Sequence, residues 1–188
     1  CVMLHIPPSE RLYYSLLSEQ DAALLLEVDQ DEEVMRFING GVKSTMEDIR
    51  QFMLPRMARY YNPQKGWGIW QVTRTADQQY LGWLLIRPMD FSSAQPLADD
   101  LEIGWRFKRH SWGNGYATEA AKAVTSAVLA ADPAVKYLSA IAMPDNHASV
   151  GVMKKLGLTF QRQGKHRDAR GQDVDVVFYR KQISECLE

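Results

Sequence analysis

The sequence predicts a mixed α+β domain, and two observations support this fold class. Apolar residues recur at helical spacing in the first 60 residues, whereas residues 67–73 and 80–87 are rich in the aromatic and branched side chains that favour strands. From residue 100 onward, strand-like and helix-like segments alternate, and no linker divides the chain. We therefore expect one domain over residues 1–188, with residues 1–8 as a flexible or edge segment.

Two helices are expected near the start of the chain. The first covers residues 18–28, where Ser18 is a candidate N-cap and apolar residues follow at helical spacing. The second covers residues 32–38 and is expected to end at the Asn39-Gly40-Gly41 sequence, because glycine commonly ends helices in a left-handed conformation.

A third helix and a β-hairpin are expected next. Ser44 or Thr45 caps the helix, and Pro55 inside it predicts a kink or break. The segments 67–73 and 80–87 then form the two strands of the hairpin.

The second half of the chain has the clearest periodicity. Residues 91–100 are polar and contain a proline, which predicts a loop, and strict alternation then predicts a strand over residues 100–107. An apolar stripe over residues 117–131 predicts a helix that Asp132-Pro133 terminates. The remaining expected elements are a strand over residues 137–142, a helix over 146–156, and strands over 160–163 and 174–181.

Composition narrows the classes of partner. A formal net charge of −1 gives no general attraction to nucleic acid or to an anionic membrane. The two cysteines, Cys1 and Cys186, stand at opposite ends and form no cluster typical of a metal site, so we expect reduced thiols and no metal. No signal peptide or membrane span is evident, which makes cytoplasmic residence the default expectation. A monomer and a homodimer both remain open.

The loop between the strand at 100–107 and the long helix has the composition of an anion site. Gly113 and Gly115 allow a sharp turn, and the following helix presents unpaired N–H groups with a positive partial charge. Such loops bind phosphate or pyrophosphate. The spacing does not match the G-x-x-x-x-G-K-[ST] loop of nucleoside triphosphatases, and the third glycine of the dinucleotide fingerprint is missing.

Two motifs extend this interpretation. The run L-E-I-G-W-R-F-K-R-H-S-W-G-N-G-Y-A-T-E-A-A, from Leu101 to Ala121, resembles motif A of the GNAT acetyltransferases. The run P-D-N-H-A-S-V-G-V-M-K-K-L-G-L, from Pro144 to Leu158, resembles the second motif of their ribosomal-protein N-terminal acetyltransferase branch, the RimJ/RimL-like proteins. The resemblance implies a GNAT-like fold, with a central, mostly antiparallel twisted sheet of six to seven strands flanked by helices.

The same resemblance implies where acetyl-coenzyme A binds. Its pantetheine arm would run along the strand beside Trp105 and Phe107, and Asn146 would contact that arm. Its pyrophosphate would lie on the amides of the loop, which are those of Trp112, Gly113, Asn114, Gly115, Tyr116, Ala117 and Thr118. Trp112 stands where the wider family has Gln or Arg, although the RimJ/RimL-like branch often has Trp there.

Glu102 and Ser149 are the candidate catalytic residues. The resemblance implies that Glu102 takes a proton from the substrate ammonium, directly or through water, and that Ser149 donates one to the departing thiolate. A solvated or ion-paired strand glutamate remains an alternative for Glu102. For Asn146 and Ser149, the alternative is a helix cap with a first-turn serine.

The leading hypothesis is therefore an N-acetyltransferase that moves an acetyl group from acetyl-coenzyme A to a primary amine by direct transfer. The acceptor would be a protein N-terminus or a small amine. Acidic residues at 29–33 and at Asp99, Asp100 and Glu102 give a weak indication of a cationic acceptor. A non-catalytic acyl-coenzyme A sensor or scaffold is the main alternative, and a phosphate-binding protein unrelated to acetyl transfer is another.

Overall fold

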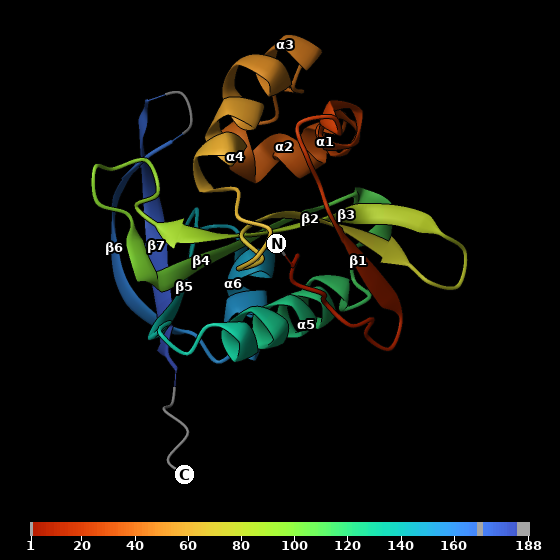
Figure 1. The fold of residues 1–188 in the computed structure, drawn as a ribbon. Coiled ribbons are helices and arrows are strands. Elements are labelled where there is room, and N and C mark those ends of the chain that lie inside the picture. Colours follow the sequence, from red (N-terminus) through yellow and green to blue (C-terminus); the bar gives the residue numbers. More distant parts are fainter. Residues whose placement is uncertain (1, 169–170, 184–188) are drawn as a thin grey trace.

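A seven-stranded sheet lies between two layers of helices in the computed structural model, which describes residues 2–168 and 171–183 (Figure 1). Cys1 and Cys186 lie outside these ranges. The strands are β1 (Leu12–Leu16), β2 (Gly68–Arg74), β3 (Gln79–Met89), β4 (Leu97–Phe107), β5 (Tyr137–Ala142), β6 (Thr159–Arg167) and β7 (Asp173–Gln182). The helices are α1 (Ala22–Val28), α2 (Glu32–Asn39), α3 (Met46–Asp48), the π-helical turn η1 (Ile49–Met53), α4 (Leu54–Tyr60), the 3-10 turn η2 (Arg109–Ser111), α5 (Tyr116–Ala131) and α6 (His147–Lys155).

The strand order is β1-β2-β3-β4-β5-β7-β6, and β4 and β5 are the one parallel pair in it. The predicted α+β class and the mostly antiparallel sheet are therefore confirmed. Helices α1 to α4 cover one face of the sheet, and α5 and α6 cover the other (Figure 1). Alternate residues of each strand point to opposite faces, so the two faces build two separate apolar cores.

The core beneath α5 and α6 is the larger of the two. The alanine-rich stripe of α5 packs there against β4, with Ala120, Ala121 and Val124 all fully buried beside Leu101 and Ile103. Small residues on this stripe let the helix approach the sheet closely. The core beneath α1 to α4 contains Leu25, Ile49, Ile69, Trp83 and Leu85.

Three expectations need correction. The five-residue edge strand β1 was not anticipated. The helix expected over residues 18–28 starts only at Ala22, and the capping roles are reversed, because the Asp21 carboxylate accepts hydrogen bonds from the backbone N–H and hydroxyl of Ser18. The loop expected over residues 91–100 is shorter, because β4 begins at Leu97, which pairs with Met89 after a bulge.

The third expected helix has both predicted features, a cap at Thr45 and a break near Pro55. Thr45 and Asp48 form a reciprocal capping box at its start. The break expected at Pro55 takes the form of the π-helical turn η1, in which the N–H of Leu54 bonds to the carbonyl of Ile49. A proline has no N–H to continue an α-helical ladder, and the wider turn before it accommodates that loss.

Residues 2–8 form neither helix nor strand, yet they are fixed to the domain. The N–H of Leu4 donates to the carbonyl of Pro63 at 2.8 Å, and Ile6 is buried in the core beneath α5 and α6. Within the described ranges, no helix is long and apolar enough to cross a membrane.

Asp100 links three strands at the point where β4 meets β5. Its side chain is fully buried, and its carboxylate accepts from the Ser139 hydroxyl of β5 at 2.7 Å and from the Arg180 guanidinium of β7 at 2.5 Å. Charge-assisted hydrogen bonds to a buried carboxylate are strong, so this contact fixes β4 relative to β5 and β7.

We expect Asp100→Ala to lower the free energy of unfolding by roughly 2–3 kcal/mol, because the hydrogen bonds to a charged group are lost and the buried Ser139 hydroxyl loses its acceptor. Urea unfolding monitored by circular dichroism measures the change. Asp77→Ala removes an exposed carboxylate that also pairs with an arginine, Arg74, and serves as the control. An effect of Asp100→Ala no larger than that of the control would contradict the linking role.

Candidate functional site

Strands β4 and β5 pair over only three residues and then separate. The last paired position is Glu102 opposite Ser139. Beyond it, residues 103–107 of β4 pair with β3, and residues 140–142 of β5 pair with β7. The edge of β4 that faces β5 therefore carries backbone groups that bond to no neighbouring strand. An extended ligand can add to such an edge as an extra strand would.

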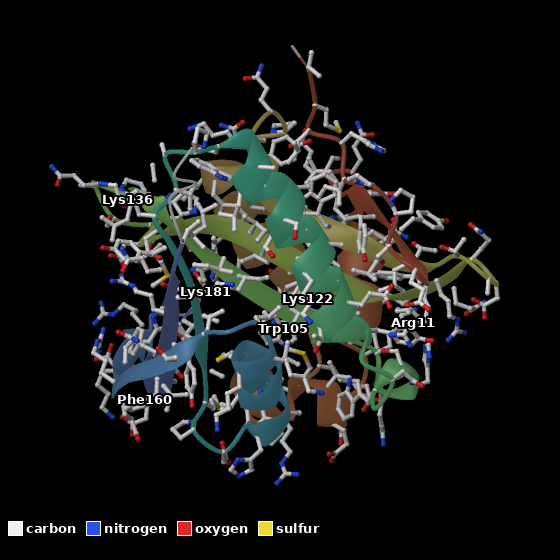
Figure 2. The ribbon with its side chains drawn as sticks, turned by 90° about the horizontal axis from the view of Figure 1, so that it is seen from below. Arg11, Trp105, Lys122, Lys136, Phe160 and Lys181 are labelled. Atoms are coloured by element: carbon white, nitrogen blue, oxygen red, sulfur yellow. The ribbon has the colours of Figure 1, made fainter. Side chains whose placement is uncertain are left out.

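Two of the sequence-predicted cofactor residues lie along this open edge. Trp105 and Phe107 point toward the layer of α5 and α6, where both contribute to the core. Seen from that layer, Trp105 lies between α5 and α6 (Figure 2). The carbonyl of Phe107 accepts a hydrogen bond of 2.9 Å from the Trp112 indole, whose ring is 48% exposed.

The loop that follows β4 presents a row of free N–H groups. No backbone N–H from Gly113 to Thr118 donates a hydrogen bond to any residue that the structure describes. Gly113 and Gly115 have φ angles of 78° and 76°, in the left-handed region that glycine tolerates best, and Gly115 is the N-cap of α5. The row therefore lies at the positive end of a 16-residue helix, which suits a phosphate or pyrophosphate group.

Residues distant in sequence hold this loop in place. The Asn114 side chain donates to the carbonyls of Ser111 and Trp112, each at 3.0 Å. Arg11 donates to the Asn114 carbonyl at 2.8 Å and to the Glu119 carboxylate at 2.7 Å. Its guanidinium also lies 4.4 Å from the centroid of the buried Tyr116 ring.

Glu119 is the centre of these contacts. Its carboxylate also accepts from the Ser9 hydroxyl at 2.6 Å and from the Arg11 backbone N–H at 2.9 Å. Burial alone would raise the pKa of Glu119, but the hydrogen bonds from Ser9 and Arg11 outweigh it and hold the pKa below its ordinary value. The N-terminal segment is thereby bound to the first turn of α5.

Asn146 and Ser149 lie where α6 begins. The Asn146 side-chain carbonyl accepts from the Ser149 backbone N–H at 3.2 Å, so the expected helix cap is present. In the described part of the chain, the Asn146 amide nitrogen and the Ser149 hydroxyl have no hydrogen-bond partner, and both residues are partly exposed. Both groups are thus available to a ligand.

Glu102 faces the opposite side of the sheet, toward α1 to α4. It is 8% exposed and forms a bidentate ion pair with Arg87 of β3, with distances of 2.9 and 3.2 Å. The two residues occupy partner positions in the β3–β4 register. Glu102 is therefore an ion-paired strand glutamate, at the point where β4 and β5 separate.

Four further residues lie near this ion pair, and three of them, Phe91, Arg56 and His166, were not expected from the sequence. The Arg87 guanidinium lies 5.3 Å from the Tyr60 ring centroid and 4.2 Å from that of Phe91, and these two rings pack edge to face. Arg56 of α4 lies 5.0 Å from the same Phe91 ring. The sequence did not predict the pairing of Arg87 with Glu102, because the expected hairpin ended at residue 87 and did not include β4.

His166 of β6 is the fourth of these residues. Burial holds the pKa of His166 below its ordinary value. The negative charge of Glu102 raises this pKa, and the positive charges of Arg87 and Arg56 lower it further. The imidazole is therefore neutral near pH 7. Burial also raises the pKa of the Tyr60 phenol, which stays protonated.

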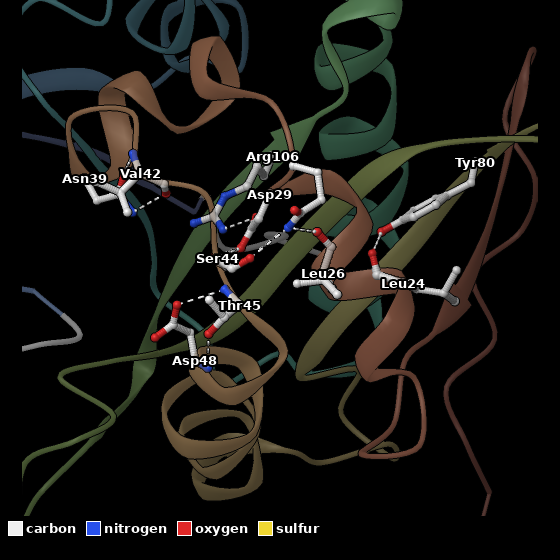
Figure 3. A network of polar contacts seen from close by, with 11 residues as sticks. Leu24, Leu26, Asp29, Asn39, Val42, Ser44, Thr45, Asp48, Tyr80 and Arg106 are labelled. Carbon is white, nitrogen blue, oxygen red and sulfur yellow. Dashed lines mark hydrogen bonds and ion pairs between the residues drawn. The ribbon is translucent and has the colours of Figure 1, made fainter.

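Four of the acidic residues that gave an indication of a cationic acceptor are paired with arginines. Asp29 is fully buried and accepts from Arg106 at 2.7 Å and from the Ser44 hydroxyl at 2.6 Å (Figure 3). Asp31 pairs with Arg109, and Asp100 and Glu102 pair with Arg180 and Arg87. These carboxylates form no free acidic groove.

A cavity of about 720 Å³ lies beside the start of the loop after β4. It is lined by Glu27, Val28, Gln30, Asp31, Lys108, Arg109 and His110. Lys108 pairs with Glu27 and Arg109 with Asp31, so its lysine and arginine are neutralised within the wall. None of its lining residues belongs to the β4–β5 opening.

Comparison with known proteins agrees with this geometry. The family model described as an acetyltransferase (GNAT) domain matches residues 11–159. The uncharacterized N-acetyltransferase YoaA of Bacillus subtilis (strain 168) is 28% identical over 166 residues, which cover 86% of this chain and 86% of YoaA.

Two solved structures show the same fold. RimL, a ribosomal L7/L12 alpha-N-protein acetyltransferase in complex with coenzyme A, has a TM-score of 0.68 at 18% identity, covering 95% of this chain and 97% of its own. The aminoglycoside acetyltransferase AAC(6')-Ib in complex with coenzyme A has a TM-score of 0.67 at 18% identity, covering 91% and 94%. Because the two match equally well, the expected ribosomal-protein branch is not singled out.

The buried carboxylate of Glu119 predicts a pH-dependent contribution to stability. Because its pKa is lower in the folded state, the contribution is fully present above about pH 4.3 and is lost as the pH falls through the folded-state pKa. Glu119→Gln should therefore destabilise the protein by about 1 kcal/mol at pH 7 and by clearly less at pH 3.5. Urea unfolding at both pH values tests this, with the exposed Glu47→Gln as control. An equal effect of Glu119→Gln at both pH values would contradict the assignment.

Proposed function

The chain belongs to the GNAT acetyltransferase family, and we propose that it transfers the acetyl group of acetyl-coenzyme A directly to a primary amine within a ternary complex. The observation that carries this proposal is the open edge of β4 leading into the free N–H groups of residues 113–118. A long ligand with an extended arm and a pyrophosphate matches both parts at once.

The cofactor-binding roles follow from this placement. The amides of residues 112–118 would hold the pyrophosphate, and Arg11 would keep the Asn114 turn in the required shape. The backbone of β4 at Trp105 and Phe107 would pair with the pantetheine arm, and the free Asn146 amide nitrogen would donate to it from the other side of the opening. Bound here, acetyl-coenzyme A supplies the acetyl group as a thioester.

Transfer requires a neutral amine, because an ammonium has no lone pair to attack the thioester carbonyl. Glu102 is our candidate base: it would take the proton from the ammonium, directly or through water. Since both Glu102 oxygens accept from Arg87, the carboxylate is held in one orientation, and binding of the amine would compete with this ion pair.

The departing thiolate requires a proton in return. Ser149 is our candidate donor, since its hydroxyl has no partner within the described residues and lies in the first turn of α6. The carbon–sulfur bond breaks as the carbon–nitrogen bond forms. The ammonium loses two protons in all: Glu102 would take the first and release it to solvent, and the second, lost as the amide forms, balances the proton that Ser149 would donate to the thiolate. No covalent enzyme intermediate is required.

The acceptor class is open between protein N-termini and small amines. The similarity to RimL supports the first, and the similarity to AAC(6')-Ib supports the second. A panel of amines and N-terminal peptides, assayed for release of free thiol from acetyl-coenzyme A, tests the proposal. Thiol release with any amine supports the enzyme. Cofactor binding without thiol release would favour the non-catalytic sensor.

We expect Glu102→Gln to lower kcat/KM for an ordinary alkylamine by about 100-fold, because the base is lost. An acceptor whose amine is already neutral at the assay pH, such as a hydroxylamine ether, should lose far less. Arg87→Met breaks the same ion pair but keeps the carboxylate, and is the matched comparison. If Arg87→Met and Glu102→Gln reduce both acceptors equally, Glu102 acts only through the ion pair.

Ser149→Ala is expected to lower kcat about 10-fold or more at saturating acetyl-coenzyme A, with the affinity for acetyl-coenzyme A nearly unchanged. Steady-state kinetics and calorimetry measure the two quantities. The exposed serine of α5 in Ser126→Ala provides the control. Full turnover in Ser149→Ala would remove this hydroxyl from the mechanism.

A further inference from the structure

Arg56 is a partly buried arginine that forms no ion pair with a described residue. Six arginines in the described ranges are partly buried: Arg11, Arg56, Arg74, Arg87, Arg106 and Arg180. Five of these form an ion pair with a carboxylate at 2.5 to 2.9 Å. Arg56 is the exception: it forms no ion pair or hydrogen bond with any described residue, and its guanidinium lies over the Phe91 ring.

A partly buried guanidinium without an ion pair loses some of its hydration and gains no carboxylate in return. Removal of a charge from water is unfavourable unless another group compensates, and buried charges are normally paired. Burial, followed by the neighbouring charge of Arg87, lowers the pKa of Arg56. The contact with the Phe91 ring face compensates only in part, because cation–π contacts are weaker than charge-assisted hydrogen bonds.

The position of Arg56 links it to the candidate site. Arg56 and Arg87 both contact Phe91, at 5.0 and 4.2 Å from its centroid, and Arg87 holds Glu102. The charges of Arg56 and Glu102 both act on His166, so these groups share one region. Arg56 belongs to α4, on the side of the sheet toward which Glu102 points.

The Arg56 guanidinium can pair with an anion. The Arg87–Glu102 pair is neutral as a unit and His166 is neutral near pH 7, whereas Arg56 forms no ion pair with a described residue. Asp168 is close enough to influence Arg56, but its carboxylate forms no ion pair with it. Its Oδ1 accepts from the Gln172 N–H. Guanidinium groups bind carboxylates through two parallel N–H···O bonds, which suits a ligand that carries a carboxylate.

We propose that Arg56 binds a carboxylate of the acceptor, so that the acceptor is a small amine of the amino-acid type. This inference rests on the proposed function and identifies its substrate class. The amine would be placed at Glu102 by an ion pair formed at the neighbouring Arg56. Cationic polyamines and aminoglycosides would be rejected, because they offer no carboxylate and meet the positive charge of Arg56.

The experiment compares each amino acid in a panel with its own carboxamide, which keeps the amine and side chain but removes the negative charge. In the unaltered protein, kcat/KM should be at least 10-fold higher for the acid than for the amide of the preferred pair. Arg56→Gln should lower kcat/KM for that acid by about 10- to 100-fold and leave its amide unchanged. Arg56→Lys should retain part of the preference for the acid over the amide, since lysine keeps the positive charge but lacks the two parallel N–H donors of a guanidinium.

Arg50→Gln, an exposed arginine in the π-helical turn before α4, is the matched control and should change neither substrate. Turnover of amines with no preference for the acid, or an equal effect of Arg56→Gln on acid and amide, would overturn the inference and leave the acetyltransferase activity standing.

A binding measurement separates this inference from the proposed function. Calorimetry with coenzyme A present compares an N-acetylated amino acid, the expected product, with its N-acetylated carboxamide. Tighter binding of the acid that Arg56→Gln abolishes supports the carboxylate site even if no amine is turned over. Equal binding of both compounds, together with no turnover, would overturn the site and the activity alike.

Discussion

The short contact between β4 and β5 is the constraint on which the rest of this structure depends. The two strands pair from Asp100 to Glu102, and the buried Asp100 carboxylate fastens that contact to Ser139 and Arg180. Every other neighbouring pair in the sheet is antiparallel and pairs over more residues. The opening beyond Glu102 therefore results from the strand pairing itself, and no movement of the chain is needed to form it. Backbone N–H and C=O groups of β4 that would otherwise bond to a neighbouring strand are therefore available to a ligand.

The two faces of the sheet divide the work of the proposed reaction. The proposed cofactor residues lie at the open edge of β4 and at the N-termini of α5 and α6, where N–H groups and a helix dipole favour phosphate. The proposed acceptor residues lie on the opposite face, under α4, where guanidinium groups are stacked on aromatic rings. Alternation along β4 connects the two, because its backbone edge serves the cofactor while Glu102 points to the acceptor.

Much of the fold could be predicted because its elements have clear periods. The stripe of α5, the alternation of β4 and the Asn146 cap of α6 each carry a local signal, and all three lie where expected. Strand β1 carried little signal because it has five residues and pairs on one side only. The candidate cofactor loop was identified from its glycines, whereas Arg11, Arg56 and His166 could not be predicted, since they approach the candidate site only through tertiary packing.

The central claim is that the β4 edge and the loop after it bind acetyl-coenzyme A. Calorimetry with acetyl-coenzyme A, with ATP and NAD as controls, followed by amide hydrogen exchange of the complex, tests it most directly. The account predicts selective binding of acetyl-coenzyme A. It also predicts slowed exchange of those amides in residues 103–107 that face away from β3 and of the amides in residues 113–118, because a ligand would pair with both sets. Folded protein that binds no acetyl-coenzyme A, or binds it without protecting these residues, would contradict the account.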